Sequence, residues 1–124
     1  IVTMDLFGIA LSGMQAAQTQ LNVAANNIAN ADTPGYQSRR ADLVELSTGG
    51  VGVAGVTSDT TPGAPQPDGK TRSNVDLARE LVNMRQAQTL YAANAMVVKA
   101  ADQMTGSLLD ILDTQDHTTY RARN

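Results

Sequence analysis

Apolar residues recur at intervals of three and four over the first 28 residues of the chain. With polar Gln18 as the one interruption, the series is Met4, Phe7, Leu11, Met14, Leu21, Ala25 and Ile28. This spacing places the side chains on one stripe of an α-helix. Thr3 is placed to cap that helix and Asp5 to favour its first turn. We expect it to end near Asn30, because residues 32–35 (Asp-Thr-Pro-Gly) are typical of a turn.

A second stripe of the same kind occupies the C-terminal half of the chain. Its members are Leu77, Leu81, Met84, Gln88, Tyr91, Ala95 and Val98, followed after a drift of one position by Val97, Ala101, Met104, Leu108 and Ile111. Such drift is typical of a straight helix with 3.6 residues per turn. Ser73 and Asp76 resemble a capping box. The pattern therefore predicts a helix over residues 74–112, followed by a frayed polar tail at 113–124.

The segment between the two stripes has a different composition. Residues 37–47 are mixed and could be extended, and residues 49–57 alternate valine with small residues, which predicts a short strand weakened by glycine. Prolines and glycines then favour a loop over residues 57–72. We predict a mainly α fold in which two long terminal helices form an antiparallel, coiled-coil-like hairpin with a short β/loop insert. The corresponding units are residues 1–36, 37–72, 73–112 and 113–124.

Both predicted helices carry very little charge. Residues 6–31 contain no charged side chain, and only Lys99 and Asp102 are charged between Gln86 and Leu109. An exposed helix face normally carries Glu, Lys and Arg. Alanine permits close helix approach, and amides form hydrogen bonds across an interface without the desolvation cost of a buried ion. The pattern favours helices surrounded by other helices in an assembly; the alternative is a soluble helical hairpin with a neutral surface.

Composition excludes several classes of function. The net charge of −3 argues against nucleic-acid binding, which requires a basic face. The absence of cysteine excludes disulfides and thiolate chemistry. No basic segment followed by an apolar run marks a cleaved signal peptide. Nine polar side chains within residues 6–31 argue against a membrane span.

Residues 25–36 strongly resemble the N-terminal signature of flagellar rod and hook proteins. The matching positions, called here the signature residues, are Ala25, Asn26, Asn27, Ile28, Ala29, Asn30, Thr33, Gly35 and Tyr36. Residues 73–84 and 91–94 are similar to the C-terminal helix of that family. We expect Asn30 to serve the helix end in left-handed geometry, Gly35 to adopt a positive φ, and Tyr36 to anchor the turn.

The resemblance implies a structural subunit of the flagellar basal-body rod, most like the short proximal-rod type. It implies export through the flagellar type III apparatus without a cleaved signal, and partners that are other copies and other rod proteins. The expected assembly stripe consists of Met4, Phe7, Leu11, Met14, Leu21, Ile28, Leu77, Leu81, Met84, Tyr91, Val98, Met104, Leu108 and Ile111. The alternative is a small helical adaptor or chaperone-like module that binds rod or export components without being incorporated.

Candidate catalytic chemistry is sparse. His117, the single histidine, lies in the polar tail, where we expect it to have no partner. Asp110, Asp113 and Asp116 lack the glycine and the terminal glutamate of a calcium loop. Lys70 follows a glycine, but the upstream spacing does not fit a phosphate loop. The sequence therefore predicts no enzyme, no metal, no cofactor and no small-molecule substrate.

Overall fold

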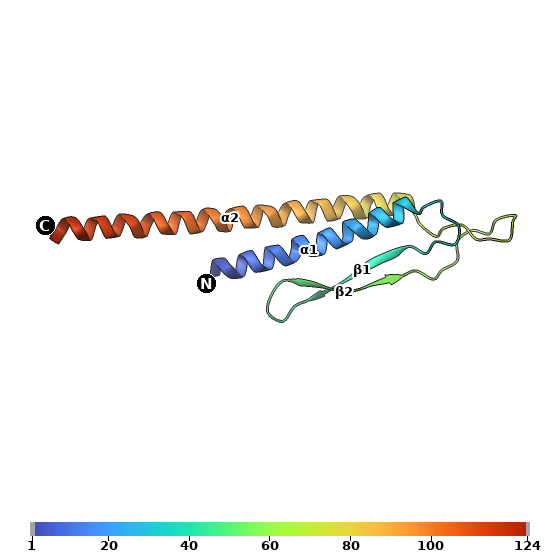
Figure 1. Cartoon of the computed structure of the whole chain (residues 1–124), viewed down its shortest axis with the longest axis horizontal. Coiled ribbons are helices and arrows are strands. Elements are labelled where there is room, and N and C mark those ends of the chain that lie inside the picture. The colour runs from blue at the N-terminus through green and yellow to red at the C-terminus, as the bar shows by residue number, and fades with distance from the viewer. Residues whose placement is uncertain (1, 124) are drawn as a thin grey trace.

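The computed structural model describes the backbone of residues 2–123 and the side chains of residues 5–122. Four elements follow one another: helix α1 (Val2–Ala29), strands β1 (Arg39–Glu45) and β2 (Val51–Ser58), and helix α2 (Leu77–Arg123). The two helices run antiparallel, and the strands form a hairpin beside α1 (Figure 1). This arrangement confirms the predicted fold class of two long helices with a short β insert.

Helix α1 ends where the sequence predicts, but it begins earlier. Its last residue is Ala29, immediately before the turn residues. Its first residue is Val2, so Thr3 lies inside the helix and its assignment as the cap is wrong. The assembly-stripe residue Met4 also lies in α1, but its side chain is outside the described residues.

Helix α2 begins at Leu77 rather than at residue 74, because Asp76 provides the N-cap. The Asp76 Oδ1 atom accepts a hydrogen bond from the Arg79 N–H at 3.3 Å. Ser73, which the capping-box interpretation placed at the cap, instead accepts a bond from the Val75 N–H at 3.1 Å in the preceding turn. The predicted capping box at Ser73 is therefore wrong.

Helix α2 also continues to Arg123, so the predicted end at residue 112 is wrong. No glycine or proline follows Gly106 to stop it. Its threonine hydroxyls bond to carbonyls one turn back, as Thr118 does to Thr114 at 2.9 Å. His117 also has a partner that we did not expect: its Nε2 atom lies 3.7 Å from the Asp113 carboxylate one turn earlier.

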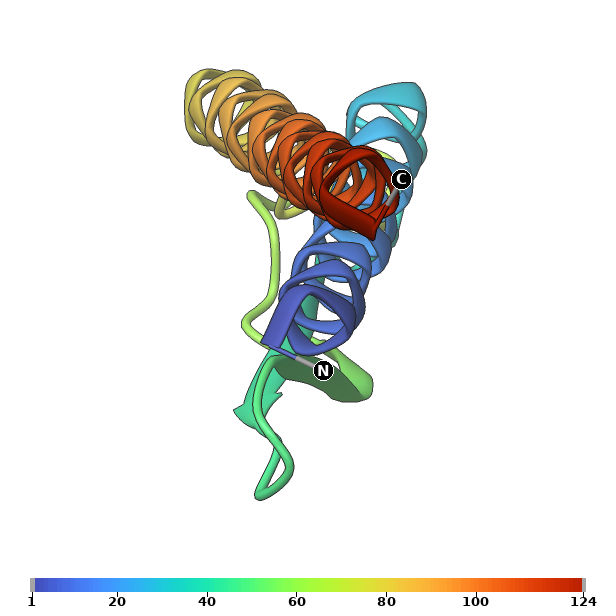
Figure 2. The same ribbon diagram turned by 90° about the vertical axis from the view of Figure 1, so that its left-hand side faces the viewer.

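The hairpin docks on α1 through its turn. β1 pairs antiparallel with β2, with an irregularity between Asp42 and Leu43. Gly50, the last residue of the hairpin turn before β2, has a φ of 88° and lies against the Ser12 hydroxyl. A side chain at this position would be both strained and blocked. The same hydroxyl accepts a hydrogen bond from the Val51 N–H at 3.1 Å. Viewed nearly end-on, α1 lies between α2 and the hairpin (Figure 2).

The apolar part of the buried core consists of small side chains. Its apolar members are Ala10, Ala16, Ala17, Ala24, Ala87 and Ala101. Gly13 of α1 lies against Asn94 of α2, and a Cβ at position 13 would come within 2.6 Å of the Asn94 amide. Small residues let two helices approach closely. We call Gly13 and the buried alanines between the two helices the small-residue seam.

Helix α2 extends well beyond the start of α1 (Figure 1). Counting equally in both directions from the Gly13–Asn94 contact places Val2 level with about Thr105. The remaining part of α2, residues 106–123, is called the overhang and is roughly 27 Å long at 1.5 Å per residue. Within residues 2–123, neither helix is long and apolar enough to cross a membrane.

Candidate assembly interface

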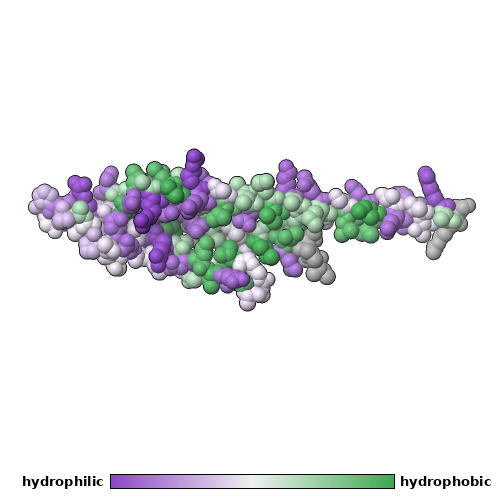
Figure 3. All heavy atoms as spheres, turned by 180° about the vertical axis from the view of Figure 1, so that it is seen from behind, coloured by the Kyte–Doolittle hydropathy of each residue, from purple (hydrophilic) through white to green (hydrophobic). Residues whose placement is uncertain are grey.

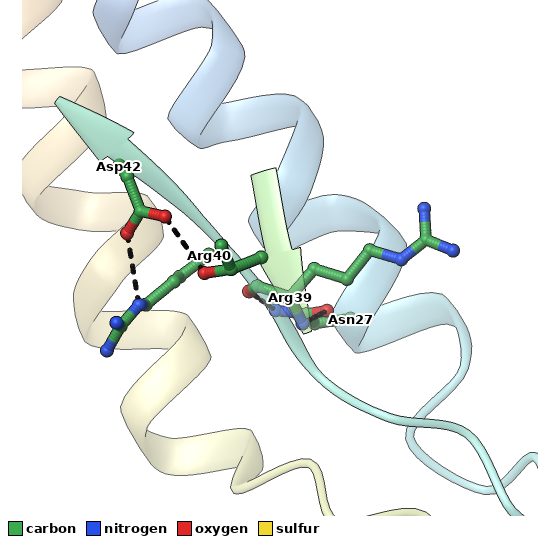
Figure 4. A network of polar contacts seen from close by, with 5 residues as sticks. Asn27, Arg39, Arg40 and Asp42 are labelled. Atoms are coloured by element: carbon green, nitrogen blue, oxygen red, sulfur yellow. Dashed lines mark hydrogen bonds and ion pairs between the residues drawn. The ribbon is translucent and has the colours of Figure 1, made fainter. Parts of the chain in front are cut away.

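Asn27 is the most constrained of the signature residues. Its side chain is fully buried. Its Nδ2 atom donates to the Arg39 carbonyl at 2.7 Å, while its Oδ1 atom accepts from the Arg39 N–H at 2.9 Å (Figure 4). The Oδ1 atom also accepts from the Tyr36 hydroxyl at 2.9 Å. One amide thus bonds both backbone groups of Arg39, as a neighbouring strand would. It fixes the start of β1 on the last turns of α1, and it confirms that Tyr36 anchors the turn.

Asn30 closes the end of α1 with its side chain. Its Nδ2 atom donates to the Asn26 carbonyl at 3.0 Å, and its Oδ1 atom accepts from the Thr33 hydroxyl at 3.0 Å. The expected left-handed geometry of Asn30 is wrong, because the non-glycine residues of the described chain all have negative φ. Gly35 alone among the signature residues has a positive φ, 74°, as predicted, and its N–H donates to the Thr71 carbonyl at 2.9 Å.

Asn74 ties three segments together just before α2. Its Oδ1 atom accepts from the Ser38 N–H at 2.6 Å, and its Nδ2 atom donates to the Asp59 and Thr61 carbonyls, both at 2.8 Å. Its own N–H donates to the Tyr36 carbonyl at 3.2 Å. The strand ends and the start of α2 therefore share one amide. Asn27 and Asn74 together hold the hairpin at a fixed place beside the helices.

The remaining signature residues differ in exposure. Ala25, Asn26 and Ala29 are exposed, and Ile28 is half-buried. Three contacts were not predicted from the sequence: the Ser12–Val51 bond, the Gly13–Asn94 packing and the hydrogen bonds of the Asn74 amide. A glycine inside a helical pattern was the available signal for close approach at Gly13. Nothing in the local pattern distinguishes Asn74 from a turn residue, because its partners are distant in sequence.

The predicted assembly stripe does not coincide with the small-residue seam. Six of its members are half-buried: Phe7, Met14, Leu21, Ile28, Met84 and Val98. Seven are exposed: Leu11, Leu77, Leu81, Tyr91, Met104, Leu108 and Ile111. The chain therefore completes its own helix pair with alanine and glycine and leaves most of its large apolar side chains at the surface.

These exposed side chains gather most densely on the overhang. Leu108, Leu109, Ile111 and Leu112 are each more than half exposed. Together with Met104, Leu108 and Ile111 line an open groove on α2. A hydrophobic cluster stands apart on this part of the molecule in the space-filling view (Figure 3). An exposed apolar patch of this kind marks an interaction surface.

Ionisable groups are scattered rather than assembled into a reactive site. Among the described residues, no group of three or more His, Asp or Glu side chains is placed to hold a metal ion. Arg40 pairs with Asp42 at 3.1 Å on the hairpin surface (Figure 4). Hydrogen bonds from Thr61, above all from its backbone N–H, hold the pKa of Asp59 below its ordinary value. These contacts stabilise turns and strands.

The chain matches two family models of axial flagellar proteins. Residues 7–37 match the flagella basal body rod protein family. Residues 71–111 match the C-terminal family of flagellar basal body rod FlgEFG proteins. The first match contains Asn27 and Asn30, and the second contains Asn74 and most of α2.

Curated relatives extend the match over most of the chain. The flagellar basal-body rod protein FlgC of Escherichia coli O6:H1 is 36% identical over 122 residues, covering 82% of this chain and 91% of the relative. FlgC of Salmonella typhimurium is 35% identical over the same coverage. The flagellar hook protein FlgE of Escherichia coli K12 is 42% identical over 69 residues, 52% of this chain and 17% of the relative. The chain belongs to the family of flagellar basal-body rod proteins.

Proposed function

We propose that the chain is a structural subunit of the flagellar rod, incorporated by packing α1 and α2 against other copies and other rod proteins. The observation that carries this proposal is the surplus of large apolar side chains outside the small-residue seam. Seven members of the predicted stripe are exposed although the helix pair is complete. Neighbouring helices would bury this surface and contribute about 25 cal/mol per Å² of apolar area.

We also propose a position in the rod and an export route for the chain. The 91% coverage of the short FlgC relative supports a place in the rod of the proximal type. We propose export through the flagellar type III apparatus without a cleaved signal peptide. An export-deficient host should then retain the chain in the cytoplasm. The role needs no catalytic group, cofactor or small-molecule substrate.

The adaptor alternative places the chain beside the rod rather than in it. Match to rod proteins over both terminal helices supports incorporation instead, because an adaptor needs only one docking face.

Substitution in the stripe tests the proposed function. Leu21 is half-buried on α1, and Leu21→Asp would place a charge in a helix interface at a cost of several kcal/mol. We expect loss of rod formation and motility in a host that lacks its own copy. Asn22→Asp is the matched control, because Asn22 is the exposed neighbour of Leu21. Normal motility with Leu21→Asp would contradict the interface assignment.

A further inference from the structure

We propose that the Arg85 side chain of a second copy inserts between the hairpin and α2 and forms an ion pair with Glu80. This inference rests on the proposed function, because it names one contact between neighbouring subunits. Three features support it: a buried carboxylate without a partner, the chemistry of the cleft in which it lies, and an unpaired arginine on another side of α2.

The first feature is the carboxylate of Glu80. Among the described residues, Glu80 is the one charged residue that is buried, with 7% of its surface exposed. Within that part of the chain, its carboxylate joins no ion pair and accepts no hydrogen bond. A buried charge without a partner is costly. The first turn of a helix favours a carboxylate, which accounts for its charge but not for its burial.

Glu80 lies in a cleft between β1 and α2, with α1 behind it. An inner hollow of about 220 Å³ is lined by all three elements, Glu80 included. An outer hollow of about 520 Å³ shares Arg39, Arg40, Glu80 and Asn83 with the inner one. We call the two hollows together the Glu80 cleft. The inner hollow is smaller than the roughly 300–1,000 Å³ of small-molecule sites, so a single side chain suits it better.

The second feature is the lining of the inner hollow, which suits a guanidinium group. Gln20, Asn83 and Gln86 line it beside Glu80, so amide oxygens are available next to the carboxylate. Leu90, which is 47% exposed, offers an apolar wall for the stem of a long side chain. A guanidinium has five N–H donors and pairs with a carboxylate through two parallel hydrogen bonds.

The arginines that line the cleft do not pair with Glu80. Arg40 pairs with Asp42 at 3.1 Å, and its side chain is 81% exposed. The Arg39 side chain extends away from α2 (Figure 4). Arg79 lines the outer hollow but not the inner one. The carboxylate therefore stays available to a cation from another chain.

The third feature is Arg85. Five positions separate it from Glu80, which turns it by about 140° around α2, so the two side chains point in different directions. In the described chain, Arg85 joins no ion pair. The four positions one turn away carry no charge: Leu81, Val82, Gln88 and Thr89. Leu81 and Val82 are 46% and 54% exposed. An arginine set among exposed apolar side chains is typical of an interface anchor.

Pairing between copies satisfies both groups at once. Lys99, the next cation along α2, has Asp102 within one turn, whereas Arg85 has no carboxylate there. The Glu80 cleft and Arg85 also lie on different sides of the subunit. Each bound copy therefore still offers a free carboxylate or a free arginine, and the assembly can continue.

A double-mutant cycle in assembled particles tests the proposal. Glu80→Gln, Arg85→Gln and the doubly substituted chain are each expressed in a host that lacks its own copy. Quantitative mass spectrometry of purified hook–basal bodies measures the chain relative to other rod proteins. We expect each single substitution to lower its content about tenfold. The double substitution should lower it no further, because both changes remove the same contact. Arg79→Gln is the matched control and should leave the content unchanged.

Exchange of the two charges gives the sharper result. Glu80→Arg with Arg85→Glu should restore the content that either change alone removes, whereas Glu80→Arg with Arg79→Glu should not. If the exchanged chain fails to fold by circular dichroism, the glutamine cycle decides.

Three results would overturn this inference and leave the proposed function standing. They are full content in both glutamine variants, additive losses in the double variant, and a loss with Glu80→Gln but not with Arg85→Gln. The last would assign the cation to a different rod protein. Absence of the unsubstituted chain from the particles would overturn both proposals.

Discussion

At the scale of single residues, asparagine amides hold the hairpin on the helices, a role that buried large apolar side chains have in other small folds. Asn27 is the one large side chain that is fully buried among the described residues. Its amide satisfies both backbone groups of Arg39, and the Asn74 amide satisfies three backbone groups from two segments, residue 38 and residues 59–61. The family signature is therefore first a device for fixing the hairpin on the helix end.

Removing the Asn27 amide should loosen the hairpin. Asn27→Ala leaves the Arg39 N–H, the Arg39 carbonyl and the Tyr36 hydroxyl without their partner. We expect a loss of about 2–3 kcal/mol in the free energy of unfolding, because buried polar groups are left unpaired. Urea denaturation followed by circular dichroism measures it. Asn26→Ala is the control, since the Asn26 side chain is exposed; equal losses in both variants would refute the role of Asn27.

Substitution of Gly50 should destabilise the hairpin more than substitution of Gly55. Gly50→Ala meets a positive φ and the Ser12 hydroxyl, whereas a Cβ at Gly55 meets no atom within 4 Å. We expect Gly50→Ala to cost about 1–2 kcal/mol and Gly55→Ala to be close to neutral. Limited proteolysis of the hairpin reports the difference. A Gly50→Ala hairpin as resistant as the unsubstituted one would show that its docking on Ser12 is unimportant.

Asp59 makes a small, pH-dependent contribution. Its pKa is lowered in the folded chain by hydrogen bonds from Thr61, so the stabilisation is present above the unfolded pKa of about 3.9 and lost as pH falls through the folded pKa. NMR titration should place the Asp59 carboxyl below the pKa of a model aspartate. In Thr61→Pro, which removes the donating N–H, the Asp59 pKa should rise toward that of the model; an unchanged value would contradict the assigned cause.

At the scale of the elements, the sequence predicts both helices, the position of the hairpin and the end of α1, because these depend on local periodicity and turn residues. It fails on the internal seam. The heptad stripe of large residues includes neither the buried Ala10 and Ala17 nor Gly13, which lies against Asn94 of α2. The end of α2 was also misplaced. Polarity alone does not stop a helix, and no glycine or proline follows Gly106.

The seam makes Gly13 and Gly8 a matched pair. Gly13→Leu would place a large side chain against Asn94, while Gly8→Leu points into open space. We expect Gly13→Leu to destabilise the helix pair by about 1–3 kcal/mol through overpacking. Gly8→Leu should be neutral or stabilising by up to about 1 kcal/mol, since glycine is a poor helix former. Thermal unfolding of both variants decides; equal melting temperatures would mean that the seam is not close-packed.

At the scale of the whole molecule, a single copy leaves many of its large apolar side chains exposed. Buried alanines and Gly13 form the internal pair, two amides anchor the hairpin, and leucine, isoleucine and methionine stay exposed along α2. Such a distribution is suited to a subunit whose remaining surface is buried by neighbours. Family membership identifies the assembly to which these neighbours belong.

The most direct test of this account is the protein content of purified hook–basal bodies. The particles would come from a host that lacks its own copy and expresses this chain, and quantitative mass spectrometry would measure the chain relative to other rod proteins. The account predicts that the chain is present in a fixed ratio to them and that Leu108→Asp removes it. A chain that restores motility but is absent from the particles would contradict the structural role.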